Sequence, residues 1–245
     1  MKAAIICPTS MLEWVQKEFN PHFHFVLAQV YLEDRQYAKF FLERRKAGDD
    51  MILDQGAAEL GASIDDVSIM VVARELKPTI LVAPDVIYNS FETMMRMGIF
   101  LKAYAEELKG LGIKIMAVPQ GEDNERYLDC FGLLNCAVKV DWLGISRFYH
   151  DRFNGRATLL ALIKDRVKKP CHLLGAGGGV YDLKDEVGFD FVKSVDTARP
   201  VRLGLDGFGL HAVTRLRPKQ FFSLPLANAE LVKRNIREYL EVTHG

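Results

Sequence analysis

Short apolar runs recur along the chain, and each is followed by a stretch in which apolar residues return every three or four positions. The runs show no polar alternation, which is typical of strands buried on both faces of a parallel sheet. The spacing between them is typical of amphipathic helices. Eight strands are therefore predicted, at residues 3–7, 23–28, 51–53, 79–83, 113–118, 142–146, 172–175 and 191–195.

Helices are predicted between these strands and after the last one. Regular alternation of strand and helix provides the crossovers of a parallel sheet, and eight such units predict an α/β fold, a (β/α)₈ barrel of the TIM type with C-terminal helices. A doubly wound sheet is the alternative, but its first turn is usually Gly-rich, whereas here the first strand leads into Cys7-Pro8-Thr9-Ser10. The predicted helices lie at 11–19, 33–47, 64–76, 90–109, 125–135, 157–167, 181–187, 203–213 and 230–242.

Composition narrows the class of protein. The chain has 49% hydrophobic and 26% charged residues, an ordinary globular balance that excludes a disordered or low-complexity protein. No long linker divides it, so a single domain over 1–245 is predicted. No apolar run approaches the ~20 residues that span a bilayer, and the first residues do not resemble a signal peptide. We therefore expect a cytoplasmic protein without membrane contact.

Cysteine and charge patterns bear on cofactors and partners. The 4 cysteines form no C-x-x-C pair, so no metal site, redox dithiol or cofactor is predicted. Formal net charge is zero, but residues 1–146 carry 15 Lys and Arg against 21 Asp and Glu, whereas residues 147–245 carry 17 against 11. The basic C-terminal portion is consistent with a polyanionic partner, and equally with the ordinary solvation of helix faces.

Acidic residues follow several predicted strands. Asp54, Asp85 and Asp196 each come at the end of an apolar run, where a barrel carries its chemistry. Carboxylates that converge repel one another, so one of them can acquire a raised pKa and act as an acid or base. Helix N-capping is the alternative role for each, and it is most plausible for Asp85, which follows Pro84.

Two further features have structural as well as functional interpretations. The glycine-rich stretch Gly175-Ala176-Gly177-Gly178-Gly179 follows the seventh predicted strand, where barrels often hold phosphate, although a tight turn explains it equally well. The histidines show no ligand spacing. His22 and His24 alternate on a predicted strand and His172 lies inside another, so structural roles are expected for them.

Five motifs at the predicted strand ends, over about residues 50–200, occur in the order found in one enzyme family. They are Asp54-Gln55-Gly56-Ala57-Ala58-Glu59, residues 82–85, Val118-Pro119-Gln120-Gly121, Leu143-Gly144-Ile145-Ser146 and His172-Leu173-Leu174-Gly175-Ala176-Gly177. On these motifs the chain resembles the tRNA-guanine transglycosylase superfamily, whose barrels exchange a guanine base for a 7-deazaguanine.

The resemblance implies a pentosyltransferase and a role for each motif. Base exchange at C1′ needs a carboxylate nucleophile to hold the sugar and an acid/base group to move a proton. By resemblance Asp54 is the acid/base residue. The residues implied to bind the base and its surroundings are Asp85, Gln120, Gly121, Gly144, Ile145, Gly175 and Gly177.

The chain departs from the family pattern at the nucleophile and at one aromatic. At the spacing of the family's nucleophile after Gly188-Phe189-Asp190 stands Lys193, which cannot play that role. Asp196, at the strand end, is the expected replacement, and Asp190 is its rival. The aromatic residue of the first motif is replaced by Ala58, which weakens base stacking.

The expected polymer is DNA rather than tRNA. The family's zinc-binding C-x-C-x-x-C module, which supports tRNA binding, is missing from the sequence, so the chain looks most like the compact phage enzymes that insert 7-deazaguanines into DNA. Such an enzyme must extrude its target base. A homo-oligomer remains open. The residues expected to hold the DNA backbone are Arg147, Arg152, Arg156, Arg199 and Arg202.

Two other functions remain open at this stage. Two strand-end carboxylates on a barrel also suit a metal-independent glycoside or nucleoside hydrolase. Lys193 at the expected nucleophile position is also compatible with a catalytically inactive barrel that only binds nucleic acid.

Overall fold

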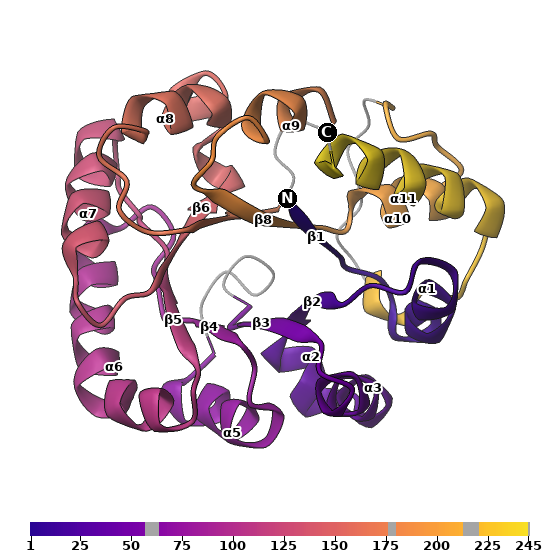
Figure 1. Ribbon diagram of the computed structural model, residues 1–245, viewed down its shortest axis with the longest axis horizontal. Helices are drawn as coiled ribbons and strands as arrows, with labels where there is room; N and C mark the ends of the chain where they lie inside the picture. Colours follow the sequence, from indigo (N-terminus) through magenta and orange to yellow (C-terminus); the bar gives the residue numbers. More distant parts are fainter. Residues whose placement is uncertain (57–63, 176–179, 213–220, 245) are drawn as a thin grey trace.

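The computed structural model describes residues 1–56, 64–175, 180–212 and 221–244, and its strands form one parallel sheet curved into a nearly closed barrel (Figure 1). The order of hydrogen-bonded strands is β1-β8-β7-β6-β5-β4-β3-β2. The predicted TIM-type (β/α)₈ barrel is therefore confirmed. The strands are β1 (Lys2–Ile5), β2 (Phe23–Leu27), β3 (Asp50–Asp54), β4 (Ile80–Val82), β5 (Lys114–Ala117), β6 (Trp142–Ser146), β7 (Cys171–Leu174) and β8 (Val192–Thr197).

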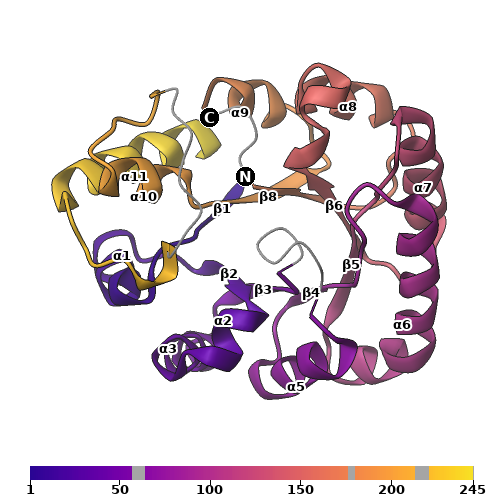
Figure 2. The ribbon, with the colours of Figure 1, turned by 180° about the vertical axis from the view of Figure 1, so that it is seen from behind.

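Helices surround the sheet in both the front and back views (Figures 1 and 2). The two ends of the chain meet beside β1, where the Met1 ammonium group donates to the Thr243 carbonyl at 3.0 Å. The helices are α1 (Leu12–Phe19), α2 (Ala28–Glu33), α3 (Arg35–Lys46), α5 (Asp66–Leu76), α6 (Ser90–Gly110), α7 (Asn124–Cys136), α8 (Arg156–Ile163), α9 (Val180–Glu186), α10 (Arg199–Leu205) and α11 (Ala229–His244). Short 3₁₀ turns η1 (Thr9–Met11), η2 (Arg147–Tyr149), η3 (Asp151–Phe153) and η4 (Phe221–Ser223) lie between them.

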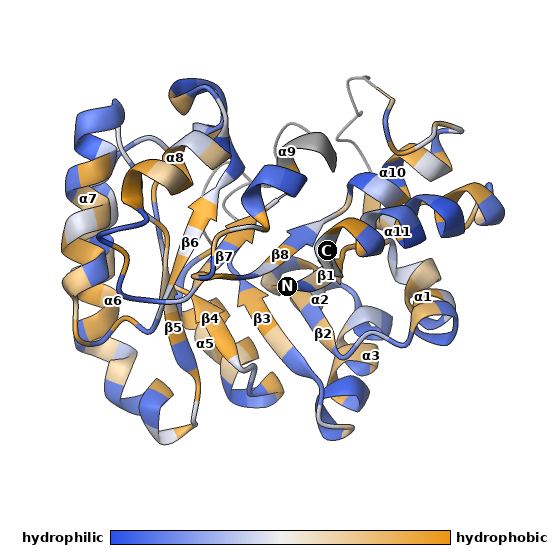
Figure 3. Cartoon of the chain, turned by 45° about the horizontal axis from the view of Figure 1, so that its top comes forward, coloured by the Kyte–Doolittle hydropathy of each residue, from blue (hydrophilic) through white to orange (hydrophobic). Residues whose placement is uncertain are grey.

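Alternate residues of each strand build two apolar layers. Ile52, Val82 and Met116 pack with Phe25 inside the barrel, while their neighbours along the strands face the helices. Both faces of the sheet are thus buried, which explains the continuous apolar runs in the sequence, drawn in orange on the strands of Figure 3. Polar side chains such as His172, Ser194 and Asp196 interrupt this apolar lining.

A β-bulge in β8 sets which of its side chains enter the barrel. Cys171 pairs with Val192, but the next residue of β7, His172, pairs with Ser194. Lys193 is the extra residue and is exposed to solvent. The bulge directs Ser194 toward the barrel interior, and by alternation Asp196 faces the same way.

One predicted helix was misplaced and one was missed. The helix predicted at 203–213 is observed as α10, Arg199–Leu205, and the chain turns after it at Gly207, whose φ is +82°. Gly204 belongs to a close contact between α10 and α11, because a Cβ there would lie 2.7 Å from the Cα of Val232. The short helix α2 follows β2 directly, at a position where the sequence predicts a connection. None of the described helices is long and apolar enough to cross a membrane.

Candidate active site at the barrel mouth

The carboxyl ends of all eight strands open at one mouth of the barrel, and the three predicted aspartates lie there. Asp54 is the last residue of β3, Asp196 is the last but one of β8, and Asp85 follows β4. Asp54 is two positions beyond the interior residue Ile52, so alternation directs its side chain inward, as it does for Asp196. All three are almost fully buried.

One oxygen of Asp196 is held by two donors. Its Oδ1 accepts from the backbone N–H of Gly175 at 2.9 Å and lies 3.1 Å from Nε2 of His172. Gly175 has φ +69°, a conformation that favours glycine, and a Cβ there would lie 2.8 Å from Cδ of Arg147. No described residue donates to the second oxygen, Oδ2. Within the described ranges, the carboxylate is therefore fixed through one oxygen.

Asp54 is held in a similar way by the turn that follows β3. Its Oδ2 accepts from the N–H of Gly56 at 2.9 Å. Gly56 has φ +80°, a conformation that favours glycine, and the side-chain amide of Gln29 packs against it. Asp54 and Asp196 thus each accept a backbone N–H from a left-handed glycine in a loop at the mouth.

Asp85 is clamped between two side-chain amides. Nε2 of Gln55 donates to Oδ1 and Nε2 of Gln120 donates to Oδ2, each at 2.5 Å. Burial raises the pKa of Asp85 to about 6, although the hydrogen bonds from Gln120 and Gln55 act in the opposite direction. Its surroundings thus bring the ionisation of this carboxyl close to neutral pH.

The orientation of Gln120 is fixed by its other end. Oε1 of Gln120 accepts from the N–H of Tyr88 at 3.1 Å and lies 2.9 Å from the hydroxyl of Tyr149. The amide nitrogen must therefore point at Asp85. Gly121 allows this arrangement, because a Cβ there would lie 2.2 Å from the backbone nitrogen of Tyr127 in α7. The role of Gly121 in the structure is close packing against α7.

Gln55 belongs to the site, although the sequence motif in which it lies indicated no role for it. Nε2 of Gln55 donates to the Ala83 carbonyl at 3.0 Å as well as to Asp85, so its amide is oriented. Its Oε1 is buried and has no partner among the described residues. A buried acceptor without a donor is costly, so this oxygen is available to a ligand N–H. In the sequence, the position of Gln55 between Asp54 and Gly56 was the feature that could have indicated a role in the site.

Gly144 and Ile145 form part of the barrel wall, and the contact of their backbone with a base stays a prediction. A Cβ at Gly144 would lie 2.8 Å from Cδ1 of Leu174 and 3.0 Å from Cγ2 of Val118, so side chains of neighbouring strands fill this space. Ile145 is fully buried, and its carbonyl oxygen lies 3.3 Å from Nη1 of Arg156. These residues therefore shape the barrel wall. Gly177 lies outside the described residues.

Arg156 was predicted to contact the DNA backbone, and its position in the structure contradicts this prediction. It is 0% exposed, and its guanidinium makes a two-pronged ion pair with Glu186 of α9, with N–O distances of 3.0 and 2.8 Å. Its Nη1 also donates to the carbonyls of Leu174 at 3.2 Å and Gly175 at 2.7 Å. Arg156 ties the ends of β6 and β7 to α9 and cannot reach a phosphate at the surface.

The other predicted arginines lie nearer the surface. Arg147 is exposed directly after β6, at the mouth. Arg152 stacks over the ring of Tyr88, with 4.3 Å between guanidinium carbon and ring centroid, and donates to the Gly121 carbonyl at 2.9 Å. Arg199 donates to the Ala212 carbonyl at 2.9 Å, and Arg202 lies over the ring of Phe221 at 4.9 Å. Arg147 is thus the member of the set best placed to meet a polyanion.

The two competitors of Asp196 lie elsewhere. Asp190 is exposed and precedes β8, at the amino end of the strand. Lys193 is exposed at the bulge. Neither side chain belongs to the mouth, whereas Asp196 lies at the carboxyl end and faces the interior.

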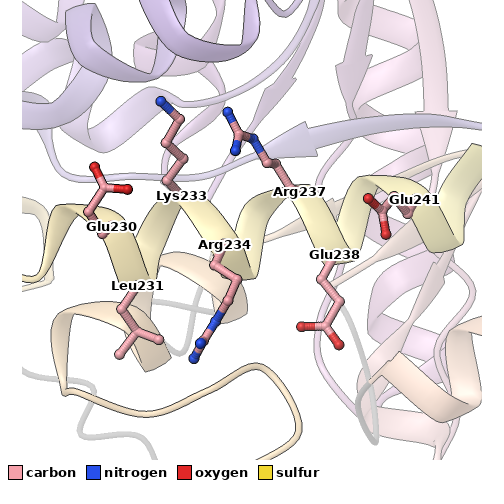
Figure 4. A pocket seen from close by; sticks show the side chains of 7 residues that line it. All are labelled: Glu230, Leu231, Lys233, Arg234, Arg237, Glu238 and Glu241. Carbon is pink, nitrogen blue, oxygen red and sulfur yellow. The ribbon is translucent and has the colours of Figure 1, made fainter.

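A separate concavity on α11 has a different character (Figure 4). Three basic side chains lie between acidic ones along it, and it includes none of the strand-end residues. No group of three or more His, Cys, Asp or Glu residues in the described ranges is arranged to hold a metal ion. The concavity is lined by Glu230, Leu231, Lys233, Arg234, Arg237, Glu238 and Glu241.

Comparison of the chain with models of known protein families gives no match, and neither does comparison with curated proteins. The functional argument therefore depends on the residues at the barrel mouth.

Proposed function

We propose that the protein is a pentosyltransferase that exchanges guanine in a polynucleotide for a 7-deazaguanine base. The observation that carries the proposal is the pair of interior-facing carboxylates at one barrel mouth, Asp54 and Asp196, each of which accepts the N–H of a left-handed glycine. Two positioned carboxyl groups provide the nucleophile and the acid/base group that base exchange requires. The order of the strand-end motifs supports the same reaction.

Asp196 is the proposed nucleophile and Asp54 the proposed acid/base group. A carboxylate oxygen of Asp196 forms a bond to C1′ of the target nucleotide as the bond from C1′ to the base nitrogen breaks. The electron pair leaves with guanine, which takes a proton from Asp54. The incoming base then gives its N9 proton to Asp54, and N9 forms the new bond to C1′ and displaces Asp196. The cycle restores both carboxyl groups.

Asp85, Gln55 and Gln120 are proposed to recognise the base. The edge of guanine presents an N–H and an amino group beside a carbonyl oxygen, which together need acceptors and one donor. The Asp85 carboxylate and Oε1 of Gln55, which has no partner among the described residues, are acceptors, and Nε2 of Gln120 is a donor. An amide whose two ends are fixed distinguishes donor from acceptor on a bound base.

The polymer is proposed to be DNA, acted on in the cytoplasm, or in the host cytoplasm if the protein is of phage origin. The exposed Arg147 at the mouth and the basic balance of residues 147–245 support a polyanionic substrate. The missing zinc module favours DNA over tRNA. A homo-oligomer is compatible with this proposal and is not needed for it.

Labelled guanine tests the proposal when it is incubated with DNA or with tRNA. We expect label to enter DNA without net loss of base, and the Asp196→Asn and Asp54→Asn variants to be inactive. Asp190→Asn is the matched control, because Asp190 is exposed at the opposite end of β8, and it should retain activity. Net release of base would instead indicate a hydrolase, and incorporation into neither polymer would indicate an inactive barrel.

A further inference from the structure

A buried histidine connects a serine to the proposed nucleophile. His172 and Ser194 are register partners on β7 and β8, and Nδ1 of His172 lies 2.7 Å from Oγ of Ser194. On the other side of the ring, Nε2 lies 3.1 Å from Oδ1 of Asp196. His172 is 0% exposed, and its ring stacks on Phe25 at 5.6 Å, with an angle of 10° between the planes. The imidazole therefore lies inside the barrel, below the mouth.

The three side chains resemble a hydrolase triad in reverse. In a Ser-His-Asp triad the serine meets the substrate and the buried aspartate orients the histidine. Here Ser194 is the deeper group, because it lies two residues before Asp196 on β8. It is 2% exposed. Asp196 is the member at the mouth. A substrate at the mouth would meet the carboxylate, so this arrangement serves Asp196 rather than Ser194.

The hydrogen bonds determine the tautomer of His172. An ionised Asp196 can only accept, so Nε2 of His172 must carry the proton that faces Oδ1. In neutral imidazole Nδ1 is then an acceptor, and the hydroxyl of Ser194 donates to it. Ser194 thereby favours the one neutral tautomer that can donate to Asp196. The chain of donors runs from Ser194 through His172 to the carboxylate.

We propose that His172, with its tautomer set by Ser194, is a positioning residue that holds Oδ1 of Asp196 and leaves Oδ2 as the oxygen that attacks the sugar. The inference rests on the proposed function for its chemical consequence. Gly175 and His172 both donate to Oδ1, while no described residue donates to Oδ2. A carboxylate fixed through one oxygen presents the other in a constant direction, which is the geometric requirement for in-line attack at C1′.

Substitution of His172 tests the role of its Nε2 proton. His172→Leu removes the donor, and we expect kcat for base exchange to fall by ~10²- to 10³-fold, as when a preorganised donor is removed, with little change in KM. His172→Gln keeps an amide N–H near the position of Nε2 and should recover part of the loss. Ser194→Ala, a small change less prone to misfold, should lower kcat by less than His172→Leu.

His24→Gln is the matched control for loss of a buried histidine. His24 is also buried, lies near the amino end of β2, and is hydrogen-bonded to Asp49 at 2.9 Å, away from the mouth. Base exchange by this variant should match the unmodified protein. If His172→Leu is as active as His24→Gln, or if His172→Gln is no better than His172→Leu, the positioning role is refuted.

Nitrogen NMR of ¹⁵N-histidine-labelled protein provides a readout that needs no activity. The His172 ring should show the tautomer with the proton on Nε2, and both Ser194→Ala and Asp196→Asn should shift its ring-nitrogen signals. A proton on Nδ1, or signals unchanged in Asp196→Asn, would overturn the inference even in an active enzyme. Conversely, the expected NMR result in a protein without base exchange would refute the proposed function and leave the Ser194–His172–Asp196 chain established.

Discussion

Each carboxylate oxygen of Asp85 accepts a hydrogen bond, one oxygen from Gln55 and the other from Gln120, and both bonds favour the ionised form of Asp85. Its burial favours the neutral form and has the larger effect, so the pKa rises to about 6 from an ordinary value of 3.8. The same carboxyl is proposed to accept hydrogen bonds from a base. Its acceptor capacity is therefore complete only above about pH 6, and guanine exchange should weaken as the pH falls below that value.

The raised pKa of Asp85 also predicts how stability depends on pH. Between about pH 4 and 6 the folded state keeps a proton that the unfolded chain has released, so the free energy of unfolding decreases as the pH rises through this range. The contribution is about 3 kcal/mol, fully present below pH 4 and lost above pH 6. Asp85→Asn cannot titrate and should lack this decrease.

Urea unfolding of the unmodified protein and Asp85→Asn at several pH values from 4 to 8 measures the effect as the difference between the two curves. Other carboxyl groups titrate in both proteins and cancel. Parallel curves across pH 4 to 6 would show that Asp85 titrates normally in the folded state.

Arg156 holds together parts of the barrel that are distant in sequence. It begins α8, pairs with Glu186 of α9 and donates to carbonyls at the ends of β6 and β7. Removal of the arginine would leave a buried carboxylate without its partner. We expect Arg156→Ala to lower the free energy of unfolding by ~3–5 kcal/mol. Arg74→Ala, which breaks the exposed ion pair with Glu107, is the control and should destabilise the protein far less than Arg156→Ala. Equal effects in chemical denaturation would contradict the structural role of Arg156.

The contact between α10 and α11 depends on the absence of a side chain at Gly204. A Cβ there would lie 2.7 Å from the Cα of Val232, and backbone cannot move aside as a flexible side chain can. Gly204→Ala should therefore destabilise the protein by ~1–3 kcal/mol, the usual cost of overpacking. Gly132→Ala in α7 is the matched control, since nothing lies within 4 Å of its added methyl group, and it should stabilise by ~0.5–1 kcal/mol. Thermal unfolding of both variants tests this, and a stabilised Gly204→Ala would show that the two helices can separate at no cost.

At the scale of the whole molecule, the sequence was sufficient to predict the barrel because each buried strand is a continuous apolar run and each crossover is an amphipathic helix. It also placed Asp54, Asp85 and Asp196 at the mouth, since strand ends follow from the runs. The contacts of His172 with Asp196, and of Arg156 with Glu186, were not predictable. They join residues 24 and 30 positions apart and depend on strand register and on the bulge at Lys193, which the apolar pattern does not encode.

DNA binding and base selection are expected to depend on different groups of this protein. Phosphate contacts contribute affinity without sequence information, whereas base recognition belongs to the groups inside the mouth. Arg147 is exposed at the mouth and Asp85 is buried within it. Arg147→Ala should therefore weaken DNA binding for all sequences and reduce the slope of log affinity against log salt by ~1, because one fewer counterion is released. Asp85→Asn should impair guanine exchange and leave DNA affinity nearly unchanged.

Lys114→Ala, at the exposed amino end of β5, is the control for loss of a positive charge away from the mouth. Titration of labelled DNA at several salt concentrations tests all three variants. An affinity insensitive to salt, or an Asp85→Asn variant that loses as much affinity as Arg147→Ala, would show that polymer binding and base recognition are not separate in this barrel.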